Sequence, residues 1–303
     1  MTTGDGFKAA TASSGKTAKE LRGDYSSMAA DFTIDQGWDR YTDTDHALWR
    51  TLYDRQSKLL PRYAARTFMD CLSRLDAGDG VPDFRRASDM LEKATGWRIV
   101  AVPGLIPEGA FFDHLANRRF PVTNWIRKPE EMDYLEEPDV FHDFFGHVPL
   151  LLHPVFADYM QAYGKGGQRA LGLGRIENLA RLYWYTVEFG LIREDGQTKV
   201  YGAGILSSAG ETPYAIESPS PNRIGFDLER VMRTRYRIDD YQQTYFVIDD
   251  YDQLFTATGV DFGPLYERLA GPPEYAPADV LPTDKVYTKG TQQRVLGTKT
   301  AAE

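Results

Sequence analysis

Two of the chain's five histidines, His142 and His147, lie close together in the aromatic and acidic segment EPDVFHDFFGHVP. Neutral imidazole is the commonest protein ligand for a metal, so this pair is a candidate half of a metal site. Residues five apart lie about 140° apart on a regular α-helix, which is too far for one face. We expect Pro149 to push Val148 away from helical angles, and Gly146 to weaken the helix locally. His142 would then lie in the last full turn, and His147 where the helix unwinds.

A third ligand is expected from the segment RIENLARLYWYTVEFGL, where apolar residues recur at helical spacings of three and four. Glu188 follows Trp184 by four residues, at the edge of this apolar stripe. A carboxylate that faces a core is costly unless it is paired or bound to a metal. Two histidines and one carboxylate with open positions form the facial triad of non-heme Fe(II) oxygenases.

Other interpretations of these three residues stay open on spacing alone. Two nearby histidines among aromatics can be core or capping residues, and Glu188 can pair with an arginine such as Arg181. A site of two histidines, one glutamate and a water is also typical of zinc-dependent hydrolases. Against a hydrolase, the pattern His-Glu-x-x-His and its inverse are absent, and no glutamate beside His142 offers a general base at the usual place.

Three motifs in the chain, PDVFHDFFGHVPLL, ARLYWYTVEFGL and YGAGILSSAGE, resemble the pterin-dependent aromatic amino acid hydroxylases in their order and sequence. The dense match runs from about Trp97 to Asp250, and it is most similar to the short bacterial forms that lack a regulatory domain. The resemblance implies hydroxylation of L-phenylalanine to L-tyrosine by O2, with a tetrahydropterin as electron donor and Fe(II) held by His142, His147 and Glu188. Hydroxylation of tyrosine or tryptophan is the alternative within the same family.

The resemblance also implies a pterin site beside the metal. The loop that begins at Pro103 leads into a short helix, and the residue that matches Phe111 stacks on the pterin ring in this family. A flat heteroaromatic ring needs a flat apolar partner, and offset stacking adds roughly 0.5–1.5 kcal/mol beyond area burial. The positions matched to the pterin are Gly104, Leu105, Ile106, Phe111, Asp143, Ala180 and Tyr183.

The same match implies an amino acid site. Arg127 would hold the substrate carboxylate, because guanidinium binds carboxylate bidentately. Ser207 would orient the first histidine ligand, and Trp184 and Phe141 would wall the ring. Ile238 stands where tyrosine-hydroxylating relatives carry an acid, which favours an unsubstituted ring because a buried unpaired hydroxyl costs roughly 1–3 kcal/mol. The full set of substrate positions is Arg127, Pro138, Trp184, Gly204, Ser207 and Ile238.

Composition limits the class of protein. The net charge of −9 argues against nucleic acid or an anionic membrane as a main partner. A single cysteine, Cys71, excludes an intrachain disulfide and suits the cytoplasm. No run of about 18 apolar residues predicts a transmembrane helix, and the first residues lack the apolar core of a secretory signal. The tetramerisation helix of the animal relatives is missing, which favours a monomer.

We expect a mainly α fold with short β-strands, in which a leader (1–36) and a loose tail (271–303) flank one catalytic domain (37–270). Helices are predicted at about 45–60 (capped by Thr44), 61–75, 83–96, 154–163, 226–232, 249–258 and 263–270. Strands are predicted at 97–102, 120–127, 201–206 and 245–248, with a glycine-rich connection at 164–174.

Overall fold

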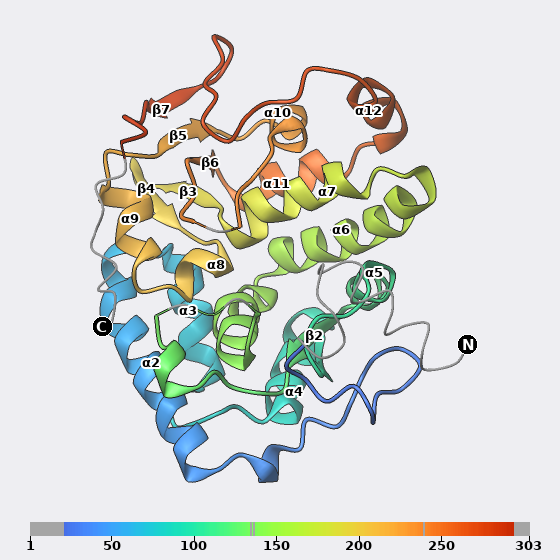
Figure 1. Ribbon diagram of the computed structural model, residues 1–303, viewed down its shortest axis with the longest axis vertical. Helices are drawn as coiled ribbons and strands as arrows, with labels where there is room; N and C mark the ends of the chain where they lie inside the picture. Colours follow the sequence, from blue (N-terminus) through green and yellow to red (C-terminus); the bar gives the residue numbers. More distant parts are fainter. Residues whose placement is uncertain (1–20, 134, 136, 239, 294–303) are drawn as a thin grey trace.

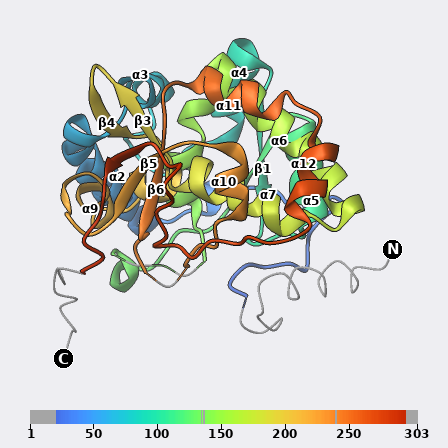
Figure 2. The ribbon, with the colours of Figure 1, turned by 90° about the horizontal axis from the view of Figure 1, so that it is seen from above.

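A computed structural model of the chain describes residues 21–133, 135, 137–238 and 240–293. The fold is mainly helical with short strands, as the sequence predicts. Figure 1 shows the larger of two sheets in the upper part of the molecule and the helices α2, α3 and α4 in the lower part. The helices α6 and α7 lie between them. In Figures 1 and 2 alike, this sheet and α5 lie on opposite sides.

Three helices form the lower scaffold: α2 (Asp43–Tyr63), α3 (Arg66–Leu75) and α4 (Phe84–Thr95). The cap of α2 is Thr42 rather than the predicted Thr44, because Thr42 and Asp45 form a reciprocal capping box. Pro61 neither ends α2 nor starts the next helix; it lies within the last turn of α2. The predicted cap at Asp83 and the closing Gly96 of α4 are confirmed.

Two parallel strands, β1 (Arg98–Val102) and β2 (Arg119–Thr123), form a small sheet that is linked by α5 (Glu108–Ala116). The five-stranded sheet has the order β4-β3-β6-β5-β7. Its strands are β3 (Leu191–Glu194), β4 (Gln197–Val200), β5 (Asn222–Gly225), β6 (Thr244–Ile248) and β7 (Val286–Thr288). The predicted strands at 97–102 and 245–248 are confirmed, while the strand predicted at 120–127 ends at Thr123.

Short elements complete the fold. The 3-10 helices are Trp38–Arg40, Pro129–Glu131 and Pro149–Leu152, and the π-helices are Phe141–His147 and Trp184–Glu188. The other helices are α6 (Pro154–Leu173), α7 (Ile176–Tyr183), α8 (Ala203–Leu206), α9 (Glu211–Glu217), α10 (Leu228–Arg233), α11 (Tyr251–Thr258) and α12 (Phe262–Leu269). The predicted helices near α10, α11 and α12 are confirmed.

The glycine-rich connection predicted at 164–174 is wrong, because α6 continues through it to Leu173. A Cβ on Gly164 would lie 2.4 Å from the Ala116 nitrogen, and one on Gly167 would lie 2.0 Å from the Phe112 ring. These glycines therefore let α6 pack closely against α5, and they do not mark a loop.

The strand predicted at 201–206 is also wrong, because this stretch forms the short helix α8. Its glycines serve close packing, since a Cβ on Gly202 would lie 2.4 Å from the Glu188 carbonyl oxygen. A Cβ on Gly146, in the facing π-helix, would likewise lie 2.9 Å from the Ala203 carbonyl oxygen. The tight approach of α8 to both π-helices is what places Ser207 beside the histidines.

The described residues outside 37–270 pack against the domain. In the predicted leader, Ile34 forms a bridge to Ala101, while residues 1–20 lie outside the described residues. In the predicted tail, β7 pairs with β5, and the buried Arg230 binds Asp284 at 3.0 Å. The stretch 271–293 is therefore attached to the sheet, although its composition predicted a loose tail. Among the described helices, none is long and apolar enough to cross a membrane.

Candidate active site

Both segments that carry the predicted metal ligands are π-helices. His142 and His147 lie in the π-helix Phe141–His147, and Glu188 ends the π-helix Trp184–Glu188. A π-helix bonds each residue to the fifth one along, so residues five apart lie closer to one face than on an α-helix. Val148 keeps helical angles (φ −62°, ψ −38°) before Pro149. The expected unwinding at Val148 is therefore wrong, and the wider helical turn brings the histidines together instead.

The three predicted ligands converge. The Nε2 atoms of His142 and His147 are 3.3 Å apart. Glu188 places one carboxylate oxygen 3.2 Å from Nε2 of His147 and the other 3.6 Å from Nε2 of His142. One ligand atom from each residue lies within 4.8 Å of the other two. No second candidate metal cluster of three such side chains occurs among the described residues.

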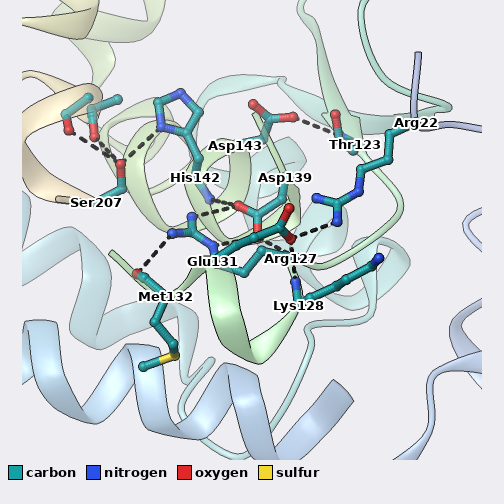
Figure 3. A network of polar contacts seen from close by, with 12 residues as sticks. Arg22, Thr123, Arg127, Lys128, Glu131, Met132, Asp139, His142, Asp143 and Ser207 are labelled. Carbon is teal, nitrogen blue, oxygen red and sulfur yellow. Dashed lines mark hydrogen bonds and ion pairs between the residues drawn. The ribbon is translucent and has the colours of Figure 1, made fainter. Parts of the chain in front are cut away.

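Ser207 sets the orientation of the first histidine. Its hydroxyl donates to the Ala203 carbonyl oxygen at 2.9 Å and so accepts from Nδ1 of His142, also at 2.9 Å (Figure 3). Because the hydroxyl has one proton, this arrangement places the His142 proton on Nδ1. The Nε2 lone pair of His142 then faces His147 and Glu188, as a metal ligand requires.

The electrostatics keep Glu188 ionised. Burial raises the pKa of this carboxyl, but the imidazoles of His147 and His142 outweigh burial and hold the pKa of Glu188 below its ordinary value. The alternative partner, Arg181, pairs instead with Glu177 at 2.9 Å and Glu274 at 2.6 Å. Glu188 is therefore a half-buried anion whose partners are imidazoles, and a divalent cation would balance its charge.

The residues fit a non-heme iron. Two imidazoles and one carboxylate match the donor set of the facial triad. His147 is nearly buried and packs against Phe120 and Tyr183, with ring centroids 5.2 and 6.2 Å away. The apolar surroundings would exclude bulk water from one side of a bound metal.

Arg127 lies next to this centre but is already paired. Its Nε and Nη2 atoms each donate to a carboxylate oxygen of Asp139 at 2.9 Å, and its backbone nitrogen donates to the same group (Figure 3). Asp139 also accepts the backbone N–H of His142 at 3.0 Å. Its pKa lies below the ordinary value, because bonds from Arg127 outweigh complete burial. Nη1 of Arg127 makes only a long bond of 3.4 Å, to the Met132 carbonyl oxygen.

Two of the residues matched to a pterin, Phe111 and Tyr183, link α5 to His147 through ring contacts. The loop with Gly104, Leu105 and Ile106 follows β1 and leads into α5, as predicted. Phe111 on α5 meets Tyr183 edge to face at 5.7 Å, and the Tyr183 ring is stacked with His147. Figure 3 shows the carboxylate of Asp143, which accepts the Thr123 backbone N–H at 2.8 Å. Burial raises the pKa of Asp143 despite both nearby imidazoles. Ala180 lies on α7 and is half-buried.

Some residues matched to the substrate lie near the proposed metal ligands, and Ile238 lies on the surface. Trp184 begins the same π-helix as Glu188, and Pro138 and Gly204 are half-buried beside the histidine segment and α8. A Cβ on Gly204 would lie 2.9 Å from the Phe189 ring. Ile238 differs from the expected apolar wall, because its side chain is 74% exposed.

Phe141 does not wall an open site either. It is fully buried and stacked on Phe145 at 4.8 Å, with Trp49 edge-on at 5.2 Å. The guanidinium carbon of Arg127 lies 5.6 Å from the centre of its ring. Phe141 therefore supports Arg127 from within the core.

Sequence reasoning missed two groups at this site. Asp139 was not singled out, although an aspartate three residues before a helical histidine is a signal for bonding to a free N–H. The predicted leader also contributes: the Tyr25 hydroxyl donates to the Leu105 carbonyl oxygen at 3.0 Å, and the backbone of Gly23 packs against Pro103. No local pattern indicates that residues 21–25 contact the loop at 103–105.

A family profile described as biopterin-dependent aromatic amino acid hydroxylase matches residues 13–258. The chain belongs to this family. Its members use a pterin and a non-heme iron, so the predictions of family, enzyme class and cofactors are confirmed, and the hydrolase alternative is not favoured.

The similar proteins are closely related over most of their length. A phenylalanine-4-hydroxylase of Caulobacter vibrioides is 60% identical over 263 residues, which cover 86% of this chain and 90% of that protein. One of Chromobacterium violaceum is 60% identical over 266 residues, with 88% and 90% covered. The solved structure of the Chromobacterium violaceum phenylalanine hydroxylase bound to cobalt has a TM-score of 0.84 and 61% identity, and the match covers 86% of this chain and 95% of that one.

Proposed function

We propose that the chain hydroxylates L-phenylalanine to L-tyrosine with O2 and a tetrahydropterin. The observation that carries the proposal is the convergence of His142, His147 and Glu188 between two π-helices. The relatives at 60% identity are named phenylalanine-4-hydroxylases, which supports phenylalanine over tyrosine or tryptophan. The test is to load the protein with Fe(II) in the absence of oxygen, and then to measure turnover with O2, a tetrahydropterin, and phenylalanine and tyrosine in competition. Preferred conversion of phenylalanine supports the proposal, and equal conversion of both contradicts it.

We propose that the metal is Fe(II) and that its ligands are His142, His147 and Glu188. Bound iron and the pterin would supply the activation of O2 and the reducing electrons. The protein would orient the reactants and exclude water. Ser207 holds the proton of His142 on Nδ1, and the buried Asp139 ties Arg127 to the first turn of the histidine helix. The similar phenylalanine hydroxylase whose structure is bound to cobalt supports metal binding by this fold.

The pterin would lie between the loop at 103–106 and the metal ligands, with its ring on Phe111. The edge-to-face contact of Phe111 with Tyr183 and the stacking of Tyr183 on His147 support this place. Asp143 and Ala180 would complete this side.

Replacing Phe111 with alanine is expected to raise the Michaelis constant for the pterin by about 2- to 12-fold from the loss of stacking alone, because a stacked ring adds roughly 0.5–1.5 kcal/mol beyond the area it buries. The constant for phenylalanine should change less than twofold. Steady-state kinetics with each substrate varied in turn measures both. An unchanged pterin constant would place the pterin elsewhere.

The amino acid would lie on the other side, with its carboxylate on Nη1 of Arg127, whose one bond is long, and its ring beside Trp184, Pro138 and Gly204. Ile238 would reach the ring only if its segment moved, since its side chain is exposed.

We also propose that the chain acts as a cytoplasmic monomer that binds no nucleic acid, which its acidic composition and single buried cysteine support. Light scattering should then give a mass near 34.3 kDa.

A further inference from the structure

Trp184 is held by a neighbouring segment that no motif indicated. The indole Nε1 of Trp184 donates to Oε1 of Gln242 at 3.0 Å, although the two residues are 58 positions apart. Tyr236 stacks on the indole at 4.3 Å with an angle of 15°, and Phe189 lies tilted at 4.8 Å. The Tyr236 ring therefore covers one face of the indole, and the Gln242 amide holds its N–H.

The amide of Gln242 has one possible orientation. An indole nitrogen only donates, so the atom that faces it must be the amide oxygen. The Nε2 atom then points toward the carbonyl oxygens of Arg237 and Asp240, at 3.0 and 3.5 Å. Gln242 is 2% exposed, so water cannot replace these bonds. A buried amide whose donor and acceptor sides are both satisfied fixes the position of its partner.

The backbone of Gln242 is held by Glu211. Its backbone nitrogen donates to Glu211 at 3.3 Å, and the Tyr245 hydroxyl donates to the same carboxylate oxygen at 2.7 Å. The backbone nitrogen of Glu211 in turn donates to the hydroxyl of Ser208 at 3.2 Å, and Ser208 directly follows Ser207. The contacts therefore run from the segment that orients His142 to the ring beside Glu188.

We propose that Gln242 is a positioning residue for the substrate ring, which holds the Trp184 indole N–H and so fixes the wall against which the phenylalanine ring lies. This inference rests on the proposed function, because it needs phenylalanine beside Trp184. A misplaced ring would let pterin oxidation proceed without hydroxylation. Gln242 would therefore set how much tyrosine is formed for each pterin oxidised.

The test is a double-mutant cycle with Gln242→Met and Trp184→Phe. Gln242→Met keeps the side-chain length and removes the acceptor, while Trp184→Phe removes the donor. Loss of one neutral hydrogen bond should raise the phenylalanine Michaelis constant about 3- to 10-fold. The ratio of tyrosine to oxidised pterin should fall, and the pterin constant should stay within about twofold. In the Trp184→Phe background, Gln242→Met should have no further effect on either quantity.

The matched control is Gln243→Met, the same change at the next position, where the side chain donates to Gln292 at 3.4 Å instead. It should leave kinetics and coupling unchanged. If Gln242→Met does not fold, Trp184→Phe probes the same bond from its other end and should reproduce the kinetic change.

A second readout does not depend on catalysis. In the NMR spectrum of ¹⁵N-labelled, metal-free protein, the Trp184 indole N–H signal is identified by its absence in Trp184→Phe. In Gln242→Met this signal should shift and exchange faster with solvent. An unshifted, protected signal would overturn the inference, and so would equal effects of Gln242→Met with and without the indole nitrogen. A wild type that is inactive on phenylalanine would contradict the proposed function, yet the indole signal would still test the bond.

Discussion

Replacing Glu188 with alanine is expected to remove bound iron and hydroxylation together, with turnover at least about 100-fold below wild type, since even changes in the groups that support metal ligands cost 10–100-fold. Glu188 supplies the only carboxylate of the three converging ligands, and its two oxygens face the two Nε2 atoms. Without it, two neutral imidazoles would face a dication with no compensating charge. Metal analysis and turnover of the purified protein measure the two effects.

The control is Glu177→Ala, the same change in α7, which directly precedes the π-helix of Glu188. The Glu177 side chain is 81% exposed and is bonded to Arg181. It should keep full iron content and activity. Wild type and this control should also show a higher Tm when Fe(II) is added, because a ligand that binds only the folded state stabilises it. Glu188→Ala should lose that increase. Full iron occupancy in Glu188→Ala would refute the ligand assignment.

Replacing Arg127 with methionine is expected to lower the free energy of unfolding by roughly 3–5 kcal/mol, because it leaves the buried Asp139 carboxylate without its cation. Asp139 is fully buried, and both of its oxygens bind the guanidinium. A stability loss alone would not show that Arg127 also binds substrate. Chemical denaturation measures this first effect.

The double variant Arg127→Met with Asp139→Asn separates the two roles. It removes the unpaired charge and keeps an oxygen that can accept the His142 N–H, so it should regain most of the lost stability. If Nη1 of Arg127 binds the substrate carboxylate, the double variant should still bind phenylalanine at least about 10-fold more weakly, since a charged hydrogen bond contributes roughly 1.5–3 kcal/mol. Phenylethylamine, which has no carboxylate, should be unaffected. Recovery of phenylalanine binding along with stability would show that Arg127 is structural only.

The sequence allowed the three proposed metal ligands to be predicted through the resemblance of its motifs and through the cost of a carboxylate that faces a core. A glutamate at the edge of an apolar stripe needs a cation, and the structure brings Glu188 to the imidazoles rather than to Arg181. The geometry that joins them could not be predicted, because nothing in the local sequence distinguishes a π-helix from an α-helix that unwinds.

Glycine-rich stretches account for the two segments that were predicted as the wrong kind of element, 164–174 and 201–206. At Gly164 and Gly202 the missing side chain makes room for a neighbouring helix or carbonyl group, while a sequence shows only that the backbone is free to turn. Partners such as Gln242 for Trp184 stayed hidden for another reason: they depend on contacts across 58 residues. Exposure is equally a tertiary property, and Ile238 lies on the surface although its type suits a core.

The most direct measurement is the origin and metal dependence of the oxygen in the product. The protein is loaded with Fe(II) or Zn(II) without oxygen and then given phenylalanine, a tetrahydropterin and ¹⁸O2, and tyrosine is analysed by mass spectrometry. The account predicts one ¹⁸O atom in each tyrosine from the Fe(II) protein and no tyrosine from the Zn(II) protein. Tyrosine formed equally well with Zn(II), or no tyrosine with Fe(II) bound, would contradict it.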